Sequence, residues 1–295
     1  MNYEDFITNS IIFQKPKLGL IETLRDDGFM PVDMHLHSEF SDTVTKMDAI
    51  IKRAAKQEIN VAVTDHNEVK GVRVASRNKL GVMVVPGMEL TCIEGAHLLF
   101  YFYTISELEE FHKKHIQPNR LANPISATKL SVNKILEISE NYNCIVSAPH
   151  PFGYKGSYCG LGKCITKHVF DESILKEVDA LEVISGCMPH KLNKKAIDYT
   201  LKEKKAITGG SDSHSLFQLG RTVTCSIADN VDDFLDNILK KQNLVIGKET
   251  LFPLKVIPAA HILRAHMRHF KATLAMQYQI RKENKERMLE NKQKR

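Results

Sequence analysis

Tryptophan is absent from the 295 residues, and no apolar run comes close to the roughly 20 residues that a membrane-spanning helix needs. The first ten residues include Glu4 and Asp5 and lack the basic start and apolar stretch of a secretory signal. Six cysteines, scattered between Cys92 and Cys225, are too few to hold a chain of this length together by disulfides. These absences predict a cytoplasmic protein with reduced thiols, in which a hydrophobic core stabilises the fold.

Positive charge is concentrated at the C-terminal end of the chain. Residues 258–295 contain ten Lys and Arg and three Glu, a local net charge of +7. The other 257 residues carry 31 positive and 32 negative charges, so they are almost neutral although the whole chain has a net charge of +6. We therefore expect a nearly neutral folded body that is followed by a basic tail.

Short apolar runs alternate with segments of helical periodicity through most of the sequence. The runs that predict strands lie at 32–37, 61–66, 82–90, 97–103, 144–150, 180–186, 206–212, 223–228 and 244–247. The segments that predict helices lie at 47–57, 107–114, 132–141, 191–204 and 231–241. Such alternation is typical of parallel βαβ units, and this number of units favours an α/β fold with a closed or nearly closed barrel.

The chain is expected to divide into an N-terminal extension at 1–31, a barrel at 32–257 and a basic amphipathic helical tail at 258–295. Long loops are expected at 115–128 and at 151–167, which is rich in glycine and aromatic residues.

Pro258 marks the expected beginning of a long helix in the tail. An apolar stripe on this helix is predicted by five residues at steps of four and three: Leu263, Met267, Phe270, Leu274 and Tyr278. The stripe predicts either packing on the barrel or docking to a partner protein, a second subunit, a nucleic acid or an anionic membrane surface. The oligomeric state stays open.

Residue types that bind metals lie at the ends of several predicted strands. The first strand ends in HLH, the second in TDH, the third in GMEL, the fifth in APHP and the seventh in GSDSH. Because residues i and i+2 of a strand point to the same face, His35 and His37 can hold one ion together, and Asp212 and His214 have the same spacing. Each short motif alone is close to chance expectation. In a parallel barrel, however, the strand ends share one rim, so the motifs together predict one metal site.

In their order, these segments resemble the PHP (polymerase and histidinol phosphatase) family. The matching segments are HLHSEFSD from His35, TDHN from Thr64, GME from Gly87, HLL from His97, the pair at 150–151 and GSDSH from Gly210. Thr43 and Ser213 depart from the residues that are commonest in the family at those positions. The resemblance spans 32–224 and implies a distorted (β/α)7 barrel with two or three divalent ions, for which Mn, Fe and Zn all suit the ligand types.

The resemblance also implies a division of nine ligands among three ions. His35, His37, Glu89 and Asp212 are expected to hold the first ion, and Asp42, His66 and His214 the second. Glu89, His97 and His150 are expected to hold the third, so that Glu89 bridges two ions. Every ligand position is occupied by a suitable residue, which argues for a catalytic member of the family.

The expected activity is the hydrolysis of a phosphate ester by metal-activated water. Three divalent ions would exceed the charge of the three carboxylates by +3, which a hydroxide and a phosphomonoester dianion would balance. The substrate is expected to be a small phosphorylated metabolite, a nucleotide or a short nucleic acid. Two alternatives remain open: an amidohydrolase-like metal hydrolase, and a subunit of a nucleic-acid-processing or protein complex that docks through residues 258–295.

Substrate contacts are predicted less directly. Arg120, Lys155 and Lys191 lie in segments that follow strand ends and are candidates for binding phosphate, with solvated surface charge as the alternative. His190 is a candidate general acid. Asp65 precedes His66 and is a candidate for orienting a ligand, or else a structural residue at a strand end.

Overall fold

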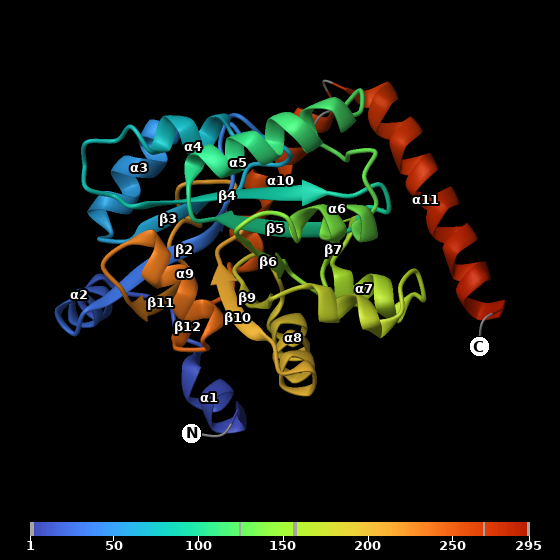
Figure 1. Ribbon diagram of the computed structural model, residues 1–295. Helices are drawn as coiled ribbons and strands as arrows, with labels where there is room; N and C mark the ends of the chain where they lie inside the picture. The colour runs from blue at the N-terminus through green and yellow to red at the C-terminus, as the bar shows by residue number, and fades with distance from the viewer. Residues whose placement is uncertain (1–2, 124, 156–157, 268, 294–295) are drawn as a thin grey trace.

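A sheet of ten strands forms the centre of the computed structural model, which describes residues 3–123, 125–155, 158–267 and 269–293. Seven neighbouring strands form a curled wall (Figure 1). In sheet order they are β2 (Phe29–Leu36), β3 (Asn60–Val63), β4 (Val84–Thr91), β5 (His97–Phe102), β6 (Cys144–Ala148), β9 (Ala180–Ser185) and β10 (Ala206–Gly210). Beyond β2 the sheet continues through β11 (Thr222–Ile227), β12 (Asn243–Gly247) and β1 (Ile11–Ile12). All nine strands expected from the sequence are therefore present.

The curled wall is closed where β10 lies against β2. One isolated bridge joins Leu36 to Ser213 there, and the backbone N–H of Ser211 donates to Asp33 Oδ1 at 2.8 Å. A Cβ added at Gly210 would lie 2.4 Å from the backbone nitrogen of His35, so the two strands approach closely. Closure by one bridge and side-chain hydrogen bonds, without a continuous ladder, makes this a distorted barrel, and the expected fold class is confirmed.

Two strands run against the expected parallel direction. β5 is antiparallel to β4 and β6, and β11 is antiparallel to β2 and β12. The connection between β4 and β5 is a tight turn, closed by hydrogen bonds from the Cys92 N–H to the Ala96 carbonyl and from the Gly95 N–H to the Cys92 carbonyl. A turn of this length permits only a hairpin, whereas parallel strands need a long crossover. The start of β5 therefore lies at the same rim as the end of β4.

Helices cover the outside of the sheet (Figure 1). The five helices expected from the sequence are confirmed as α3 (Met47–Lys56), α5 (Ile105–Phe111), α6 (Val132–Ser139), α8 (His190–Glu203) and α9 (Val231–Leu239). In α3, residues Met47, Ile50, Ile51 and Ala54 recur at helical spacing and are buried. Four short helices were not predicted: α1 (Tyr3–Ser10), α2 (Leu18–Asp26), α4 (Lys70–Ala75) and α7 (Leu161–Thr166).

The interior of the barrel is apolar below the rim. Ala62, Val85 and Leu99 belong to one buried cluster, which also includes Phe234 and Ile238 of α9. Val85 and Leu99 each lie an even number of positions from a metal-ligand candidate on the same strand, Glu89 and His97, so both residues of each pair point to the same face of the sheet. The polar side chains at the rim therefore lie above a packed layer of apolar side chains.

Two expectations, one about a loop and one about the beginning of a helix, were wrong. The segment at 151–167 is not one loop, because it contains the hairpin β7 (Tyr154–Lys155) and β8 (Tyr158–Cys159) and the helix α7 (Leu161–Thr166). Pro258 does not begin the C-terminal helix but lies inside α10 (Phe252–Met267), which is followed by a separate helix, α11 (Phe270–Gln293). Proline removes one helical hydrogen bond, and here the helix continues past that loss.

No helix in the described ranges is both long enough and apolar enough to span a membrane.

Candidate metal centre

Nine His, Asp and Glu side chains from different parts of the chain meet at the rim of the barrel. His35 lies on β2, and His37 is the first residue after that strand. Segments that follow other strands supply His66, His150, Asp212 and His214. β4 supplies Glu89, β5 begins with His97, and Asp42 lies in the segment between β2 and α3. Every expected ligand is therefore in this cluster, and seven of the nine are at least 91% buried. The two more accessible members are His97 and His150.

Glu89 lies at the centre of the cluster and its two oxygens face different histidines. Oε1 is 2.7 Å from His97 Nδ1 and 3.2 Å from His150 Nε2. Oε2 is 3.2 Å from His37 Nε2 and 3.4 Å from His35 Nε2. A carboxylate with one oxygen toward each of two ligand groups has the geometry of a bridge between two ions.

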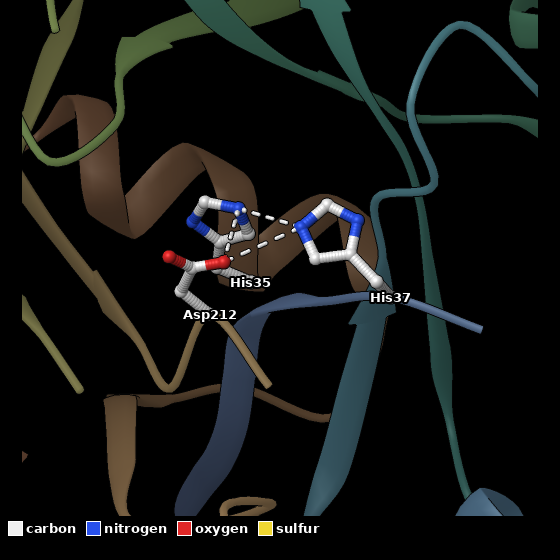
Figure 2. A group of neighbouring side chains, drawn as sticks. All are labelled: His35, His37 and Asp212. Atoms are coloured by element: carbon white, nitrogen blue, oxygen red, sulfur yellow. Dashed lines mark hydrogen bonds and ion pairs between the residues drawn. The ribbon is translucent and has the colours of Figure 1, made fainter. Parts of the chain in front are cut away.

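His35, His37 and Asp212 point toward one another (Figure 2). The Nε2 atoms of the two imidazoles are 3.3 Å apart, and Asp212 Oδ1 lies 3.7 Å from His35 Nε2 and 3.4 Å from His37 Nε2. Both imidazoles thus turn a nitrogen toward the same carboxylate oxygen. The backbone of Asp212 has φ 48°, in the left-handed region that non-glycine residues rarely adopt, as expected where a functional position determines the conformation.

A second group surrounds Asp42. Its Oδ2 is 3.1 Å from His214 Nε2 and 3.7 Å from His66 Nε2. Its Oδ1 is 3.9 Å from His37 Nδ1, so His37 lies between the first and the second group. Cys187 also comes near, because its thiol donates to the Asp212 carbonyl at 3.0 Å, and the sequence did not single it out.

Burial and mutual contact shift the pKa values of this cluster in opposite directions. Burial lowers the pKa of His37, but Asp212, Glu89 and Asp42 outweigh it and raise the value to about 10. Burial lowers the pKa of His66 to about 3. Burial opposes ionisation of Glu89, yet His66, His97 and His35 hold its pKa well below the usual range. The cluster therefore stabilises charged carboxylates next to positive charge, which protons or metal ions can supply.

The donor set fits divalent metal ions. His37 Nδ1 is buried and has no hydrogen-bond partner among the described residues. His35 Nε2 and His37 Nε2 face each other at a distance where the two rings cannot both donate. Imidazole nitrogens and carboxylate oxygens are suitable ligands for Zn, Mn and Fe. Four groups of three of these nine residues bring ligand atoms within 4.8 Å of one another.

Glu182 supports the cluster and was not predicted from the sequence. Its Oε1 is 3.0 Å from His35 Nδ1, and its Oε2 accepts from the backbone N–H of His150 at 2.7 Å. A carboxylate on the far nitrogen of a ligand histidine orients the ring and raises its basicity. The signal was an acidic residue inside the apolar run ALEVIS of β9, where it is 1% exposed.

Glu182→Gln is expected to weaken metal binding and lower kcat by about 10- to 100-fold, as other losses of a partner behind a ligand do. The change keeps the volume and removes the charge that holds His35. Titration calorimetry with Mn²⁺ or Zn²⁺ and steady-state kinetics measure the two effects. Glu137→Gln on α6 is the matched control, because Glu137 pairs only with Lys134 on the surface. Equal metal affinity in both variants would contradict the role given to Glu182.

Asp65 acts on the backbone and not on the neighbouring ligand ring. Its Oδ1 accepts from the Ser38 N–H and its Oδ2 from the Ser38 hydroxyl, both at 2.7 Å. This pair holds the segment after His37 against the end of β3. The hydrogen bonds of Asp65 thus go to Ser38, which follows the ligand candidate His37.

Two of the candidate substrate contacts have partners outside the cluster. Arg120 Nε donates to the Asn67 carbonyl at 3.1 Å, and Arg120 Nη2 lies 3.3 Å from Glu68 Oε2. His190 Nδ1 is 2.7 Å from Glu249 Oε1 on the surface, and Lys191 is exposed at the start of α8. The side chain of Lys155 lies outside the described residues. Local sequence position did not show that Arg120 and His190 have carboxylate or carbonyl partners elsewhere.

A cavity of about 660 Å³ opens onto the cluster. Six of the nine ligand candidates line it: Asp42, His66, Glu89, His97, His150 and Asp212. Its opposite wall is formed by residues of α10 and α11, among them Leu263 and Phe270. The C-terminal helices thus contribute directly to the site, which the sequence did not indicate.

Similar proteins agree with this geometry. Residues 33–199 match the PHP domain and residues 190–243 match the PHP-associated segment. An uncharacterized protein of Methanocaldococcus jannaschii is 25% identical over 195 residues, which are 65% of this chain and 68% of that protein.

Two solved structures share the fold. One is endonuclease Q in complex with a duplex that has an abasic lesion at the active site, with a TM-score of 0.59, 19% identity and coverage of 75% of this chain. This chain spans only 60% of endonuclease Q. The other is a two-domain protein from Bacteroides vulgatus with a predicted PHP-like metal-dependent phosphoesterase, with a TM-score of 0.55, 15% identity and coverage of 80% and 68% of the two chains. Because the PHP domain match covers more than half of the residues, this chain belongs to the PHP domain family.

Proposed function

We propose that the chain hydrolyses a small phosphomonoester at a centre of two or three divalent ions held by the nine clustered residues. The observation that carries this proposal is the central position of Glu89, whose oxygens face separate groups of histidines. The proposed ligand groups follow from these contacts. His35, His37 and Asp212 form one group, Asp42, His66 and His214 the second, and His97 and His150 the third, with Glu89 shared.

Bound divalent ions supply a water of lowered pKa and neutralise the oxygens of a phosphoryl group. The protein's own residues orient these components. Glu182 holds the ring of His35, and Asp65 holds the segment that follows His37. The buried apolar layer below the rim excludes water from the side of the cluster that faces the barrel interior. His97 and His150 face the cavity, from which a phosphoryl group has direct access to Glu89 and Asp212.

A small ester is favoured over a nucleic acid by the charge of the cavity. Among the described residues that line it, none is Lys or Arg. A protein that follows a nucleic-acid backbone needs such cations near the phosphates. The described basic residues of α11 lie outside the cavity lining and offer charge to a nucleic acid there, so a single-stranded oligonucleotide belongs in the substrate screen.

Removal of metal is expected to abolish hydrolysis of p-nitrophenyl phosphate, and added Mn²⁺, Fe²⁺ or Zn²⁺ is expected to restore it. Elemental analysis after reloading is expected to find about three ions per chain, given the three ligand groups. The melting temperature should rise on reloading, because the ions bind only the folded cluster.

Full activity in the chelator-treated protein would contradict the proposal. So would a loaded protein that hydrolyses neutral amides and leaves every phosphate ester intact, which would favour an amidohydrolase-like enzyme. Cleavage of the oligonucleotide at a rate far above that of small esters would replace the proposed substrate by a nucleic acid.

A further inference from the structure

The predicted apolar stripe of the tail does not hold the tail to the barrel. α11 packs instead through Met276 and Ile280, which are 4% and 0% exposed and contact Ala127. Two residues turn a helix by roughly 200°, so Met276 lies on the opposite side of α11 from Leu274. Leu274 is 50% exposed. The fold thus uses one face of α11 for packing and leaves the stripe uncovered.

Polar contacts fix α11 in this orientation. Arg287 Nη2 lies 2.9 Å from Oε1 of the buried Glu94, and Asn284 Nδ2 donates to the Glu94 carbonyl at 2.9 Å. Further along, Asn291 Nδ2 donates to the His168 carbonyl at 3.1 Å. Because these contacts hold the C-terminal half of α11, the directions of Phe270 and Leu274 on that helix are set by the fold.

Four of the five stripe residues line the cavity above the metal cluster. Leu263 and Met267 come from α10, and Phe270 and Leu274 come from α11. They are 62%, 63%, 58% and 50% exposed. Large apolar side chains that are exposed together usually mark a binding surface. Here that surface and the metal ligands belong to one continuous cavity.

We propose that the substrate is a phosphomonoester of an apolar alcohol, whose hydrocarbon part lies on Leu263, Met267, Phe270 and Leu274 while its phosphate meets the metal cluster. This inference rests on the proposed phosphoesterase function and specifies its substrate class. The cavity of about 660 Å³ has the size of sites for small organic ligands and greatly exceeds a phosphate group. Its described lining residues include no Lys or Arg that could bind a second phosphate.

The test uses the metal-loaded full chain and a series of alkylphosphonates with methyl, butyl, hexyl and octyl groups, which bind without being hydrolysed. Each added methylene is expected to lower Kd about two- to fourfold until the hydrocarbon fills the cavity, as burial of CH₂ groups predicts. Isothermal titration calorimetry measures binding, at concentrations below micelle formation. kcat/KM for the matching alkyl phosphates is expected to rise in the same order and to exceed that for adenosine monophosphate.

The preference for a long chain is measured by the Kd of methylphosphonate divided by the Kd of octylphosphonate. Leu263→Ser combined with Leu274→Ser is expected to reduce this ratio by at least about tenfold. Both positions are half exposed or more, so serine there leaves no buried cavity. Leu289→Ser is the matched control, because Leu289 is a 53% exposed leucine of α11 outside the cavity lining. The control is expected to keep the chain-length dependence of the unchanged protein.

Two failures can be told apart. If no phosphonate binds and no phosphate ester is hydrolysed, the proposed function itself fails. If methylphosphonate binds and small esters are hydrolysed but chain length has no effect, only the apolar substrate class is wrong. The inference is also overturned if Leu263→Ser with Leu274→Ser converts a dimer into a monomer in sedimentation, because the stripe would then be an interface between two copies.

Discussion

Glu89→Gln is expected to lower kcat for phosphate esters by at least about 10³-fold. Metal ions supply several kcal/mol of transition-state stabilisation, and about 1.4 kcal/mol corresponds to a factor of ten in rate. Glutamine has the size of Glu89 but lacks the negative charge that the two oxygens of Glu89 share and turn toward the surrounding histidines. We expect the variant to bind fewer ions, because its amide offers only one oxygen.

The measurement combines kcat at saturating Mn²⁺ with the number of bound ions per chain. Glu107→Gln serves as a control, since Glu107 lies on the exposed first turn of α5 and contacts Thr104. If Glu89→Gln retains both its full ion content and its full rate, a bridging role for Glu89 is excluded.

Gly210→Ala is expected to lower the free energy of unfolding by about 1 to 3 kcal/mol, the usual cost of overpacking a tight interior. A Cβ at this position would lie 2.4 Å from the Cβ and from the backbone nitrogen of His35. Because backbone atoms cannot rotate away, β10 and β2 must separate where the barrel closes. His35 moves with β2, so metal affinity is expected to fall as well.

Urea unfolding of the chelator-treated protein measures this effect without a contribution from bound ions. Gly19→Ala in α2 is the matched control, because the nearest atom to its Cβ would be Glu22 Oε2 at 4.0 Å. Alanine also favours a helix over glycine, so the control is expected to keep or slightly increase stability. Equal stability of the two variants would show that the closure between β10 and β2 can relax.

The nine ligand candidates could be predicted because their signal is local. HLH, TDH and GSDSH combine metal-binding residue types with the end of an apolar run, and strand periodicity places alternate residues on one face. His97 is different, because it begins its strand. Its position at the shared rim depends on the antiparallel direction of β5, which the sequence pattern did not reveal.

Long-range partners explain what the sequence missed. Glu182 supports His35 from a strand 147 positions away, and only the curl of the sheet brings them together. Arg120 was a candidate for phosphate or for solvated surface charge, and the fold places the Asn67 carbonyl and Glu68 beside it. In both cases the role of the side chain depends on which charged or polar group the fold places beside it.

The sequence by itself determined the strands, the main helices, the family and the ligand candidates, because periodicity and residue chemistry are local properties. Tertiary structure alone decided where the barrel closes and that Glu182 lies behind His35. It also decided the use of the C-terminal apolar stripe. Periodicity identified Leu263 and Leu274 as members of one stripe, but they lie on the separate helices α10 and α11, and the packing of Met276 and Ile280 on the barrel leaves Leu274 in the lining of the cavity at the metal site. A helix has several faces, and only its partners select the one that is buried.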